Sequence, residues 1–177
     1  MQRFRLVLGC SFLAACLVSG FTVAQENQVV RVGVTVLGSA NGITPEGGRD
    51  RLVKALNKQR KAQLQAVPLE GSGGDQVSAD ARQKNCEFVV FTTVTEAHAE
   101  SQATQTGTGG SFTNIKEFHA TVEYKLYRLS DATPVATGSA KSHDIGSQGE
   151  VVGQALDNVA KKVSADIKNA PAAPAPK

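Results

Sequence analysis

Residues 116–129 read KEFHATVEYKLYRL and alternate between apolar and polar side chains. The even positions from 118 to 126 carry Phe, Ala, Val, Tyr and Leu, whereas the odd positions between them carry His, Thr, Glu and Lys. This period of two predicts a half-buried β-strand. The turn residues of 130–134 (SDATP) follow, and residues 135–142 (VATGSAKS) return as a second strand. The stretch therefore predicts an antiparallel hairpin with one face toward a core.

Residues 148–168, which follow this hairpin, predict the longest helix of the chain. Five aliphatic side chains recur there at helical spacing and form one stripe: Val152, Leu156, Val159, Val163 and Ile167. An apolar stripe of this kind needs an apolar surface to cover. We expect the helix to pack on the exposed apolar face of the sheet.

The N-terminal half begins with residues 29–37 (VVRVGVTVL), whose β-branched side chains are typical of a central strand. A helix over residues 45–61 follows, with Thr44 as its N-cap and Pro45 at its first position. Glycines at 47 and 48 weaken the first turn. We therefore expect regular helix from about Arg49.

Three further elements complete this half. Residues 64–69 predict a short strand, and Pro68 favours the edge of a sheet for it because proline cannot donate to a ladder. Residues 77–85 predict a short helix. Residues 87–95 predict a buried strand that can extend to Glu100.

The resulting order is βαβαβββα, and right-handed crossovers place the first two helices on opposite faces of the sheet. The predicted fold class is α/β. It consists of a mixed five-stranded sheet in the order 2-1-3-4-5, numbered along the chain, with three helices packed on it and an antiparallel C-terminal meander. The strand over residues 135–142 is then the open edge of the sheet.

The predicted single α/β domain occupies residues 25–169. Residues 104–114 (TQTGTGGSFTN) show no apolar periodicity and predict a mobile loop. Residues 170–177 (APAAPAPK) predict a semi-extended Pro/Ala-rich tail outside the core.

Residues 1–24 predict a secretory signal peptide. Two arginines stand near the start, and residues 6–20 then carry no charge. This apolar run is shorter than the roughly 20 residues of a membrane-spanning helix. Small side chains precede a cut between Ala24 and Gln25, as signal peptidase requires. The protein is therefore expected in the periplasm or secreted.

A second interpretation of the same segment stays open. Residues 13–16 (LAAC) match a bacterial lipobox, in which Cys16 becomes the lipidated N-terminus. The apolar run continues beyond Cys16, whereas a lipoprotein usually turns polar soon after its cysteine. The alternative location is therefore the outer membrane, with the same domain anchored at Cys16.

The composition of the exported chain bounds its partners. The formal charge of +3 includes the two arginines of the signal, and the remaining 153 residues carry 17 basic and 16 acidic side chains. No block of five basic residues occurs, so no nucleic-acid partner is expected. Two of the three cysteines lie in the signal, which leaves Cys86 next to residues 88–91 (FVVF). We expect Cys86 to be a buried core residue and not a reactive thiol.

Patterns that would carry chemistry are weak. His98 and Glu100 share one face of an extended strand, and with His119 they are the candidate residues of a small-molecule or metal-binding module. His143 lies beside a predicted turn. Spacing alone does not bring three or four ligands together, so we predict no catalytic residue, no metal site and no cofactor. Residues 107–110 contain glycines but lack the lysine of a phosphate-binding loop.

Residues 79–82 (ADAR) and 85–90 (NCEFVV) form a short helix that leads to a buried strand, and residues 124–138 (YKLYRLSDATPVATG) form a strand–turn–strand hairpin. With the terminal helix, these segments resemble the envelope domains of the CsgG, LpoB and TolB N-terminal group. Pro134 stands where that group usually has a turn glycine. The resemblance implies a non-enzymatic protein-binding or assembly role at the cell envelope, with no particular partner.

Three functional hypotheses follow. The first is an exported, non-catalytic accessory or scaffold domain that binds an envelope protein through residues 101–114 or through the open edge at 135–142. The second is a small-molecule or metal-binding periplasmic module. The third is an outer-membrane lipoprotein, attached to the membrane only through Cys16. A secretion pore is disfavoured, because residues 101–114 are too polar for membrane-crossing strands.

Overall fold

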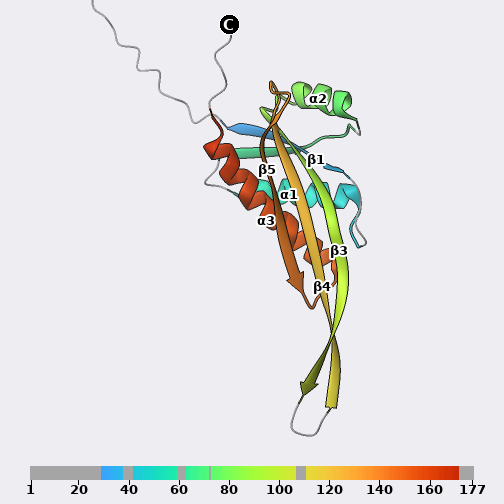
Figure 1. The fold of residues 1–177 in the computed structure, drawn as a ribbon. Helices are drawn as coiled ribbons and strands as arrows, with labels where there is room; N and C mark the ends of the chain where they lie inside the picture. The colour runs from blue at the N-terminus through green and yellow to red at the C-terminus, as the bar shows by residue number, and fades with distance from the viewer. Residues whose placement is uncertain (1–28, 38–41, 60–62, 72, 107–110, 172–177) are drawn as a thin grey trace, which may run out of the picture.

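A computed structural model describes residues 29–37, 42–59, 63–71, 73–106 and 111–171 (Figure 1). Its elements confirm the predicted βαβαβββα order. They are β1 (Val30–Leu37), α1 (Pro45–Asn57), β2 (Leu64–Pro68), α2 (Gly74–Gln83), β3 (Phe88–Thr106), β4 (Ser111–Arg128), β5 (Pro134–Asp144) and α3 (Gln148–Asn169).

The described strands form one five-stranded sheet in the order β2-β1-β3-β4-β5, which confirms the predicted topology. β1 pairs in parallel with β2 and with β3, whereas the β3–β4 and β4–β5 pairs are antiparallel. β2, which contains Pro68, forms one edge of the sheet and β5 forms the other. The three antiparallel strands are the predicted meander.

Different helices cover the two faces of the sheet. α1 and α3 pack on one face, where Leu56 and Leu156 belong to the larger core cluster. α2 packs on the other face, where Val77 joins a smaller cluster with Cys86 and Val89. We call the side of α1 and α3 the inner face and the side of α2 the outer face. The predicted placement of α1 and α2 on opposite faces is confirmed.

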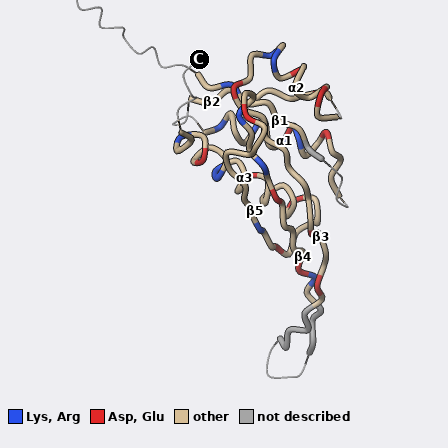
Figure 2. Tube along the Cα trace, turned by 45° about the horizontal axis from the view of Figure 1, so that its top comes forward, with Lys and Arg blue, Asp and Glu red and all other residues tan. Residues whose placement is uncertain are grey.

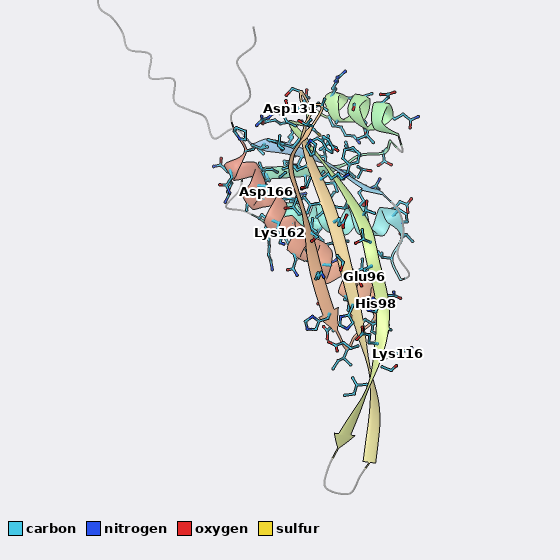
Figure 3. The ribbon with its side chains drawn as sticks, in the orientation of Figure 1. Glu96, His98, Lys116, Asp131, Lys162 and Asp166 are labelled. Atoms are coloured by element: carbon cyan, nitrogen blue, oxygen red, sulfur yellow. The ribbon has the colours of Figure 1, made fainter. Side chains whose placement is uncertain are left out.

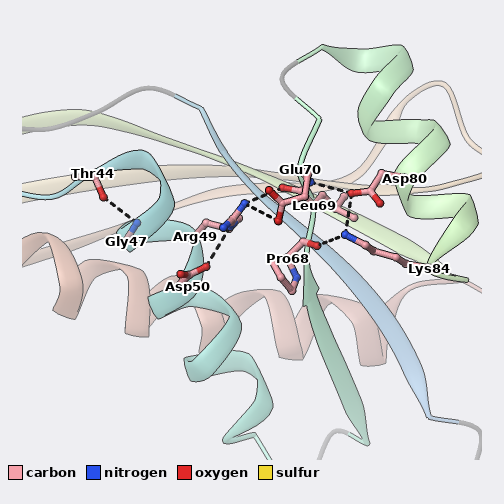
Figure 4. Close-up of polar contacts among 9 residues, drawn as sticks. All are labelled: Thr44, Gly47, Arg49, Asp50, Pro68, Leu69, Glu70, Asp80 and Lys84. Carbon is pink, nitrogen blue, oxygen red and sulfur yellow. Dashed lines mark hydrogen bonds and ion pairs between the residues drawn. The ribbon is translucent and has the colours of Figure 1, made fainter.

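A polar network joins α2 to the end of β2 (Figure 4). Asp80 Oδ2 accepts hydrogen bonds from the Glu70 backbone N–H at 2.8 Å and from Lys84 Nζ at 3.0 Å. Lys84 Nζ also donates to the Pro68 carbonyl at 2.8 Å, and Arg49 of α1 lies 3.3 Å from the Glu70 carboxylate. The hydrogen bond from Glu70 is the main reason that the pKa of Asp80 is lowered. These bonds hold α2 at one end of the sheet, and α2 is the only one of the described helices that packs on the outer face.

The ends of α1 differ from the predicted ends. The Thr44 hydroxyl accepts from the Gly47 N–H at 3.0 Å, which confirms the N-cap, and the helix already begins at Pro45 because this bond offsets the glycines of the first turn. The helix ends at Asn57 and not at residue 61. The Asn57 side chain bonds to both the N–H and the carbonyl of Ala66, which connects the last turn of the helix directly to β2.

The prediction of a mobile loop over residues 104–114 is wrong for its two ends. β3 continues to Thr106 and β4 starts at Ser111, with Thr104 opposite Thr113. Residues 107–110 lie outside the described residues. Threonine is β-branched and favours strands, so a Thr-rich segment pairs as a ribbon without any apolar alternation. Periodicity alone does not detect such a strand.

Candidate functional site

A long ribbon of β3 and β4 extends beyond the other elements of the fold (Figure 1). β1 pairs with β3 as far as Thr93, and β5 pairs with β4 as far as Phe118. Farther along, Glu100–Thr106 and Ser111–Glu117 pair with each other in seven consecutive pairs. We call these two segments the arm. At about 3.3 Å per residue, the arm spans about 23 Å.

The three histidines of the chain lie in one row where the arm leaves the body of the sheet. His98 of β3 stands opposite His119 of β4, and His119 stands opposite His143 of β5. The ring centroids are 5.3 Å and 5.9 Å apart, and both ring pairs are stacked, at interplanar angles of 14° and 20°. His143 is the last residue but one of β5, so it lies beside the connection to α3, as the sequence predicts.

Carboxylates surround the first two histidines of this row. His98 Nε2 lies 3.3 Å from Glu100 Oε1, which confirms that these two side chains share a face, and His98 Nδ1 lies 3.6 Å from Glu96 Oε1. The second Glu100 oxygen is 3.9 Å from His119 Nε2. Thr121 Oγ1 donates to Glu96 Oε2 at 2.8 Å, and this bond is the main reason that the pKa of Glu96 is lowered. The structure thus brings together the three predicted residues and adds Glu96 and Thr121, which the sequence analysis missed.

A β-bulge makes this row face outward. The β3–β4 register shifts between Val94 and Glu96, and the extra residue Thr95 reverses the alternation of faces along β3. After the bulge Ala97 packs against the inner core, whereas His98 lies on the outer face (Figure 3). The sequence holds only a local trace of this change, in which apolar Val94 is followed by Ala97 and Ala99, because residues 88–91 are apolar at even and odd positions alike.

The histidine row lies on an open face of the sheet. Three surface hollows with volumes of 390, 410 and 430 Å³ lie elsewhere. The first two follow the outer face around Phe91 and Lys125, and the third lies around Arg51 between α1 and α3. The concave pocket that the second hypothesis expects around His98 and His119 is not one of these three hollows.

β5 is the open edge that the sequence predicts, but α3 already contacts its backbone. Lys162 Nζ donates to the Ser139 carbonyl at 2.6 Å (Figure 3), and Asn158 Nδ2 donates to the Lys141 carbonyl at 3.4 Å. A strand that added to this edge would compete with these donors. The structure therefore favours the arm over β5 as a contact surface.

Cys86 is 5 % exposed and belongs to the small core cluster under α2, which confirms the prediction of a buried thiol. Burial is the largest of the causes that raise its pKa, followed by the nearby charge of Asp80. A raised pKa disfavours the thiolate, which is the reactive form of cysteine. The side chain therefore behaves as a small apolar core residue.

Basic and acidic side chains are interspersed along the described part of the chain (Figure 2). Several of them pair with each other, such as Arg51 with Asp157 at 2.9 Å and Lys84 with Asp80 at 3.0 Å. Pairing within the chain weakens the field that these cations offer to a phosphate backbone.

The predicted processing sites, Cys16, Ala24 and Gln25, lie outside the described residues. Within the described ranges, none of the helices has the length and hydropathy needed to cross a bilayer. The prediction that residues 170–177 lie outside the core is wrong for the first two of them, because Ala170 packs against the core and the Pro171 carbonyl accepts a hydrogen bond from Arg128. Residues 172–177 lie outside the described residues.

Comparison with known proteins connects this geometry to known folds. No protein-family model matches the chain, and no curated protein matches it in sequence. Among solved structures, the hypothetical protein CT253 from Chlamydia trachomatis is similar, with a TM-score of 0.52 at 12% sequence identity. The match covers 79% of this chain and 98% of CT253. A variant of the PelC dodecamer from Paraburkholderia phytofirmans has a TM-score of 0.50 at 17% sequence identity, and the match covers 74% of this chain and 84% of the PelC chain.

TolB from Acinetobacter baumannii is also similar, with a TM-score of 0.44 at 15% identity, and the match covers 82% of this chain and 30% of TolB. Bacterial lipoproteins are among the other structural neighbours. At such identities the likeness to CT253 and PelC shows a shared fold and nothing finer. The resemblance to the CsgG and LpoB group therefore stays a prediction.

Proposed function

We propose that this chain is an exported, non-catalytic accessory or scaffold domain of the cell envelope, and that it binds another protein through the arm. The observation that carries this proposal is the length of β-ribbon that continues after β1 and β5 have ended. An isolated two-stranded ribbon is marginally stable in water. A partner that pairs with it or packs on it would supply the missing contacts.

The arm offers its backbone to such a partner. Beyond Thr93 on β3 and before Phe118 on β4, the two strands pair with each other in the described part of the chain, and their outer edges carry N–H and C=O groups that can accept an added strand. The described edge of β5 differs, because side chains of α3 donate to two of its carbonyls. Main-chain pairing would provide affinity, and the side chains along the ribbon would provide specificity.

Export is the second part of the proposal. It rests on the arginines, the apolar run and the small residues of 1–24. The mass of the protein isolated from its host decides between the two processing routes. A chain that starts at Gln25 supports cleavage after Ala24, a diacylated Cys16 supports the outer-membrane lipoprotein, and a retained Met1 would contradict both.

The test of the arm is a variant in which residues 102–115 are replaced by an Asn-Gly turn that joins Ser101 to Lys116. These two residues stand opposite each other in the ribbon, and Asn-Gly is the preferred two-residue hairpin turn. Gln76→Ala/Gln83→Ala is the matched control, because both glutamines are exposed on α2, at the other end of the molecule (Figure 1). Each protein is used as bait in cross-linking and pull-down from the envelope fraction of the host.

We expect the full chain and the α2 control to recover the same specific partner, and the short-arm variant to lose it while it keeps the same melting temperature. Recovery of the same proteins by the short-arm variant would contradict the proposal. A second copy of the chain is the alternative partner, since open strand edges are self-complementary and the similar PelC structure is described as a dodecamer. Sedimentation of the purified chain alone separates these two cases.

A further inference from the structure

The base of the arm carries a side-chain cluster that protein binding does not explain. We propose that His98, Glu100 and His119 bind a divalent transition-metal ion of the Zn²⁺ class on the outer face of the sheet. The inference is independent of the arm's partner, because it concerns the strand pair at the point where the ribbon leaves the body.

The donor set suits such an ion. Two imidazoles and one carboxylate are ligands of tetrahedral zinc sites, with metal–ligand distances of about 2.0–2.2 Å. Those distances place neighbouring donors about 3.3–3.5 Å apart around a tetrahedral ion. His98 Nε2 and Glu100 Oε1 are already 3.3 Å apart, whereas Glu100 Oε2 and His119 Nε2 are 3.9 Å apart.

Side chains must turn to close this set, because the His98 and His119 rings are stacked at 14° and an imidazole binds a metal in the plane of its ring. As the side chains stand in the described residues, no group of three or more His, Cys, Asp or Glu could hold a metal ion. The longer separation exceeds the tetrahedral value by about half an ångström. The Glu100 side chain is 55% exposed and can rotate to make up this difference, since exposed side chains change rotamer within nanoseconds.

Two further observations indicate that the imidazoles are set up for a ligand. The Nδ1 side of His98 faces Glu96, which Thr121 in turn holds, so that Nε2 is directed at Glu100. A carboxylate behind a histidine is the usual support of a metal ligand, because it orients the ring and raises its basicity. His119 Nε2 is excluded from solvent and has no hydrogen-bond partner among the described residues. An ion at this position would satisfy that nitrogen.

His143 supplies a matched control within the same row. Its ring stacks on His119, but its Nε2 lies 4.0 Å from Glu117 and its side chain is 71% exposed. This carboxylate is farther from His143 than Glu96 is from His98, at 4.0 Å against 3.6 Å. We therefore assign it no coordinating role.

The test is calorimetric titration of the purified chain, free of any affinity tag, with ZnCl₂ at neutral pH. We expect one Zn²⁺ per chain, with no comparable heat for Mg²⁺, which prefers oxygen ligands. His98→Ala, His119→Ala and Glu100→Ala should each abolish saturable binding. Glu96→Gln should weaken it by about 10–100-fold, the loss typical of a supporting carboxylate. His143→Ala should leave the affinity unchanged within about threefold.

A loss of folding cannot mimic these results, because the melting temperature of each variant is measured without metal and compared with that of the parent chain. Paramagnetic Cu²⁺, which imidazole also binds, should broaden the ring resonances of His98 and His119 before those of His143. No saturable Zn²⁺ binding by the parent chain would overturn the proposal. An equal loss for all three histidine variants would also overturn it, since it would indicate diffuse association along the row.

Discussion

The hydroxyl of Tyr124 joins β4 to α3 and provides a sharp test of how the sheet is held to its long helix. It donates to Asp166 Oδ2 at 2.6 Å, and Tyr124 is 5% exposed. The ring lies against Gly138 of β5, where an added Cβ would come within 2.8 Å of it. Tyr124→Phe keeps the ring on this glycine and removes only the hydroxyl. Any loss of stability then reports on the hydrogen bond.

We expect Tyr124→Phe to lower the free energy of unfolding by about 1.5–2 kcal/mol. A hydrogen bond to a charged group contributes about 1.5–3 kcal/mol, and the lower part of this range applies because half-buried Asp166 can still be hydrated in the variant. For a domain of this size, the change corresponds to a fall in melting temperature of about 3–8 °C. Urea and thermal unfolding followed by far-UV circular dichroism measure both quantities.

The same bond predicts a dependence on alkaline pH. Burial, followed by the hydrogen bond and the charge of Asp166, raises the pKa of Tyr124 well above its usual range. An unfolded tyrosine has a pKa of about 10, so above this pH the unfolded chain releases a proton that the folded chain keeps. The contribution of Tyr124 is therefore fully present below about pH 10 and decreases as the pH rises further. Tyr124→Phe should remove this alkaline loss.

Tyr127→Phe is the matched control, because the ring of Tyr127 packs edge-on against Phe91 on the outer face at 5.5 Å and phenylalanine preserves this contact. We expect the control to change the free energy of unfolding by no more than about 0.5 kcal/mol. The reasoning would be refuted if both variants lost equal stability. It would also fail if Tyr124→Phe kept the full alkaline loss of the parent chain.

Three further predictions concern the outer face. Asp80→Ala should lower the free energy of unfolding by about 1 kcal/mol at neutral pH, as measured by urea unfolding. The difference between the variant and the parent chain should become smaller in acid, because the pKa of Asp80 is lowered in the folded chain and its stabilising contribution is lost as the pH falls through that pKa. Cys86 should resist thiol reagents in the native chain and react only as the chain opens; rapid labelling of the folded protein would contradict its burial. Deletion of Thr95 should keep His98 opposite His119 and preserve any Zn²⁺ affinity within about threefold, whereas a lost or much weaker site would show that the bulge also shapes it.

The elements that the sequence predicts well are those whose pattern is set by a core. The stripe of α3 and the alternation of β4 both follow from burial on the inner face, and Leu156 and Val122 lie there as expected. Thr44 and Pro45 also mark the start of α1, since capping depends on a few adjacent residues. The end of α1 is less predictable, because Asn57 bonds to Ala66 of a later strand.

The arm is the part of the fold that apolar patterning does not predict. Its two strands are held by backbone pairing across the ribbon from Glu100↔Glu117 to Thr106↔Ser111. Residues 104–114 lack the signal on which periodicity depends. Threonine content was the available indication of strand, and it carries less weight than hydrophobic alternation because β-propensity depends strongly on context.

The candidate metal site shows how one unpaired residue can decide the chemistry of a surface. If Thr95 took a regular place in the ladder, the next residues of β3 would reverse faces, and His98 would lie opposite Phe118 and point at the inner core. The bulge instead sets His98 opposite His119, with Ala97 facing inward. The spacing of His98 and Glu100 in the sequence predicts that their side chains share one face of β3. Whether this is the inner or the outer face, and that His119 lies opposite His98, depends on the register between β3 and β4.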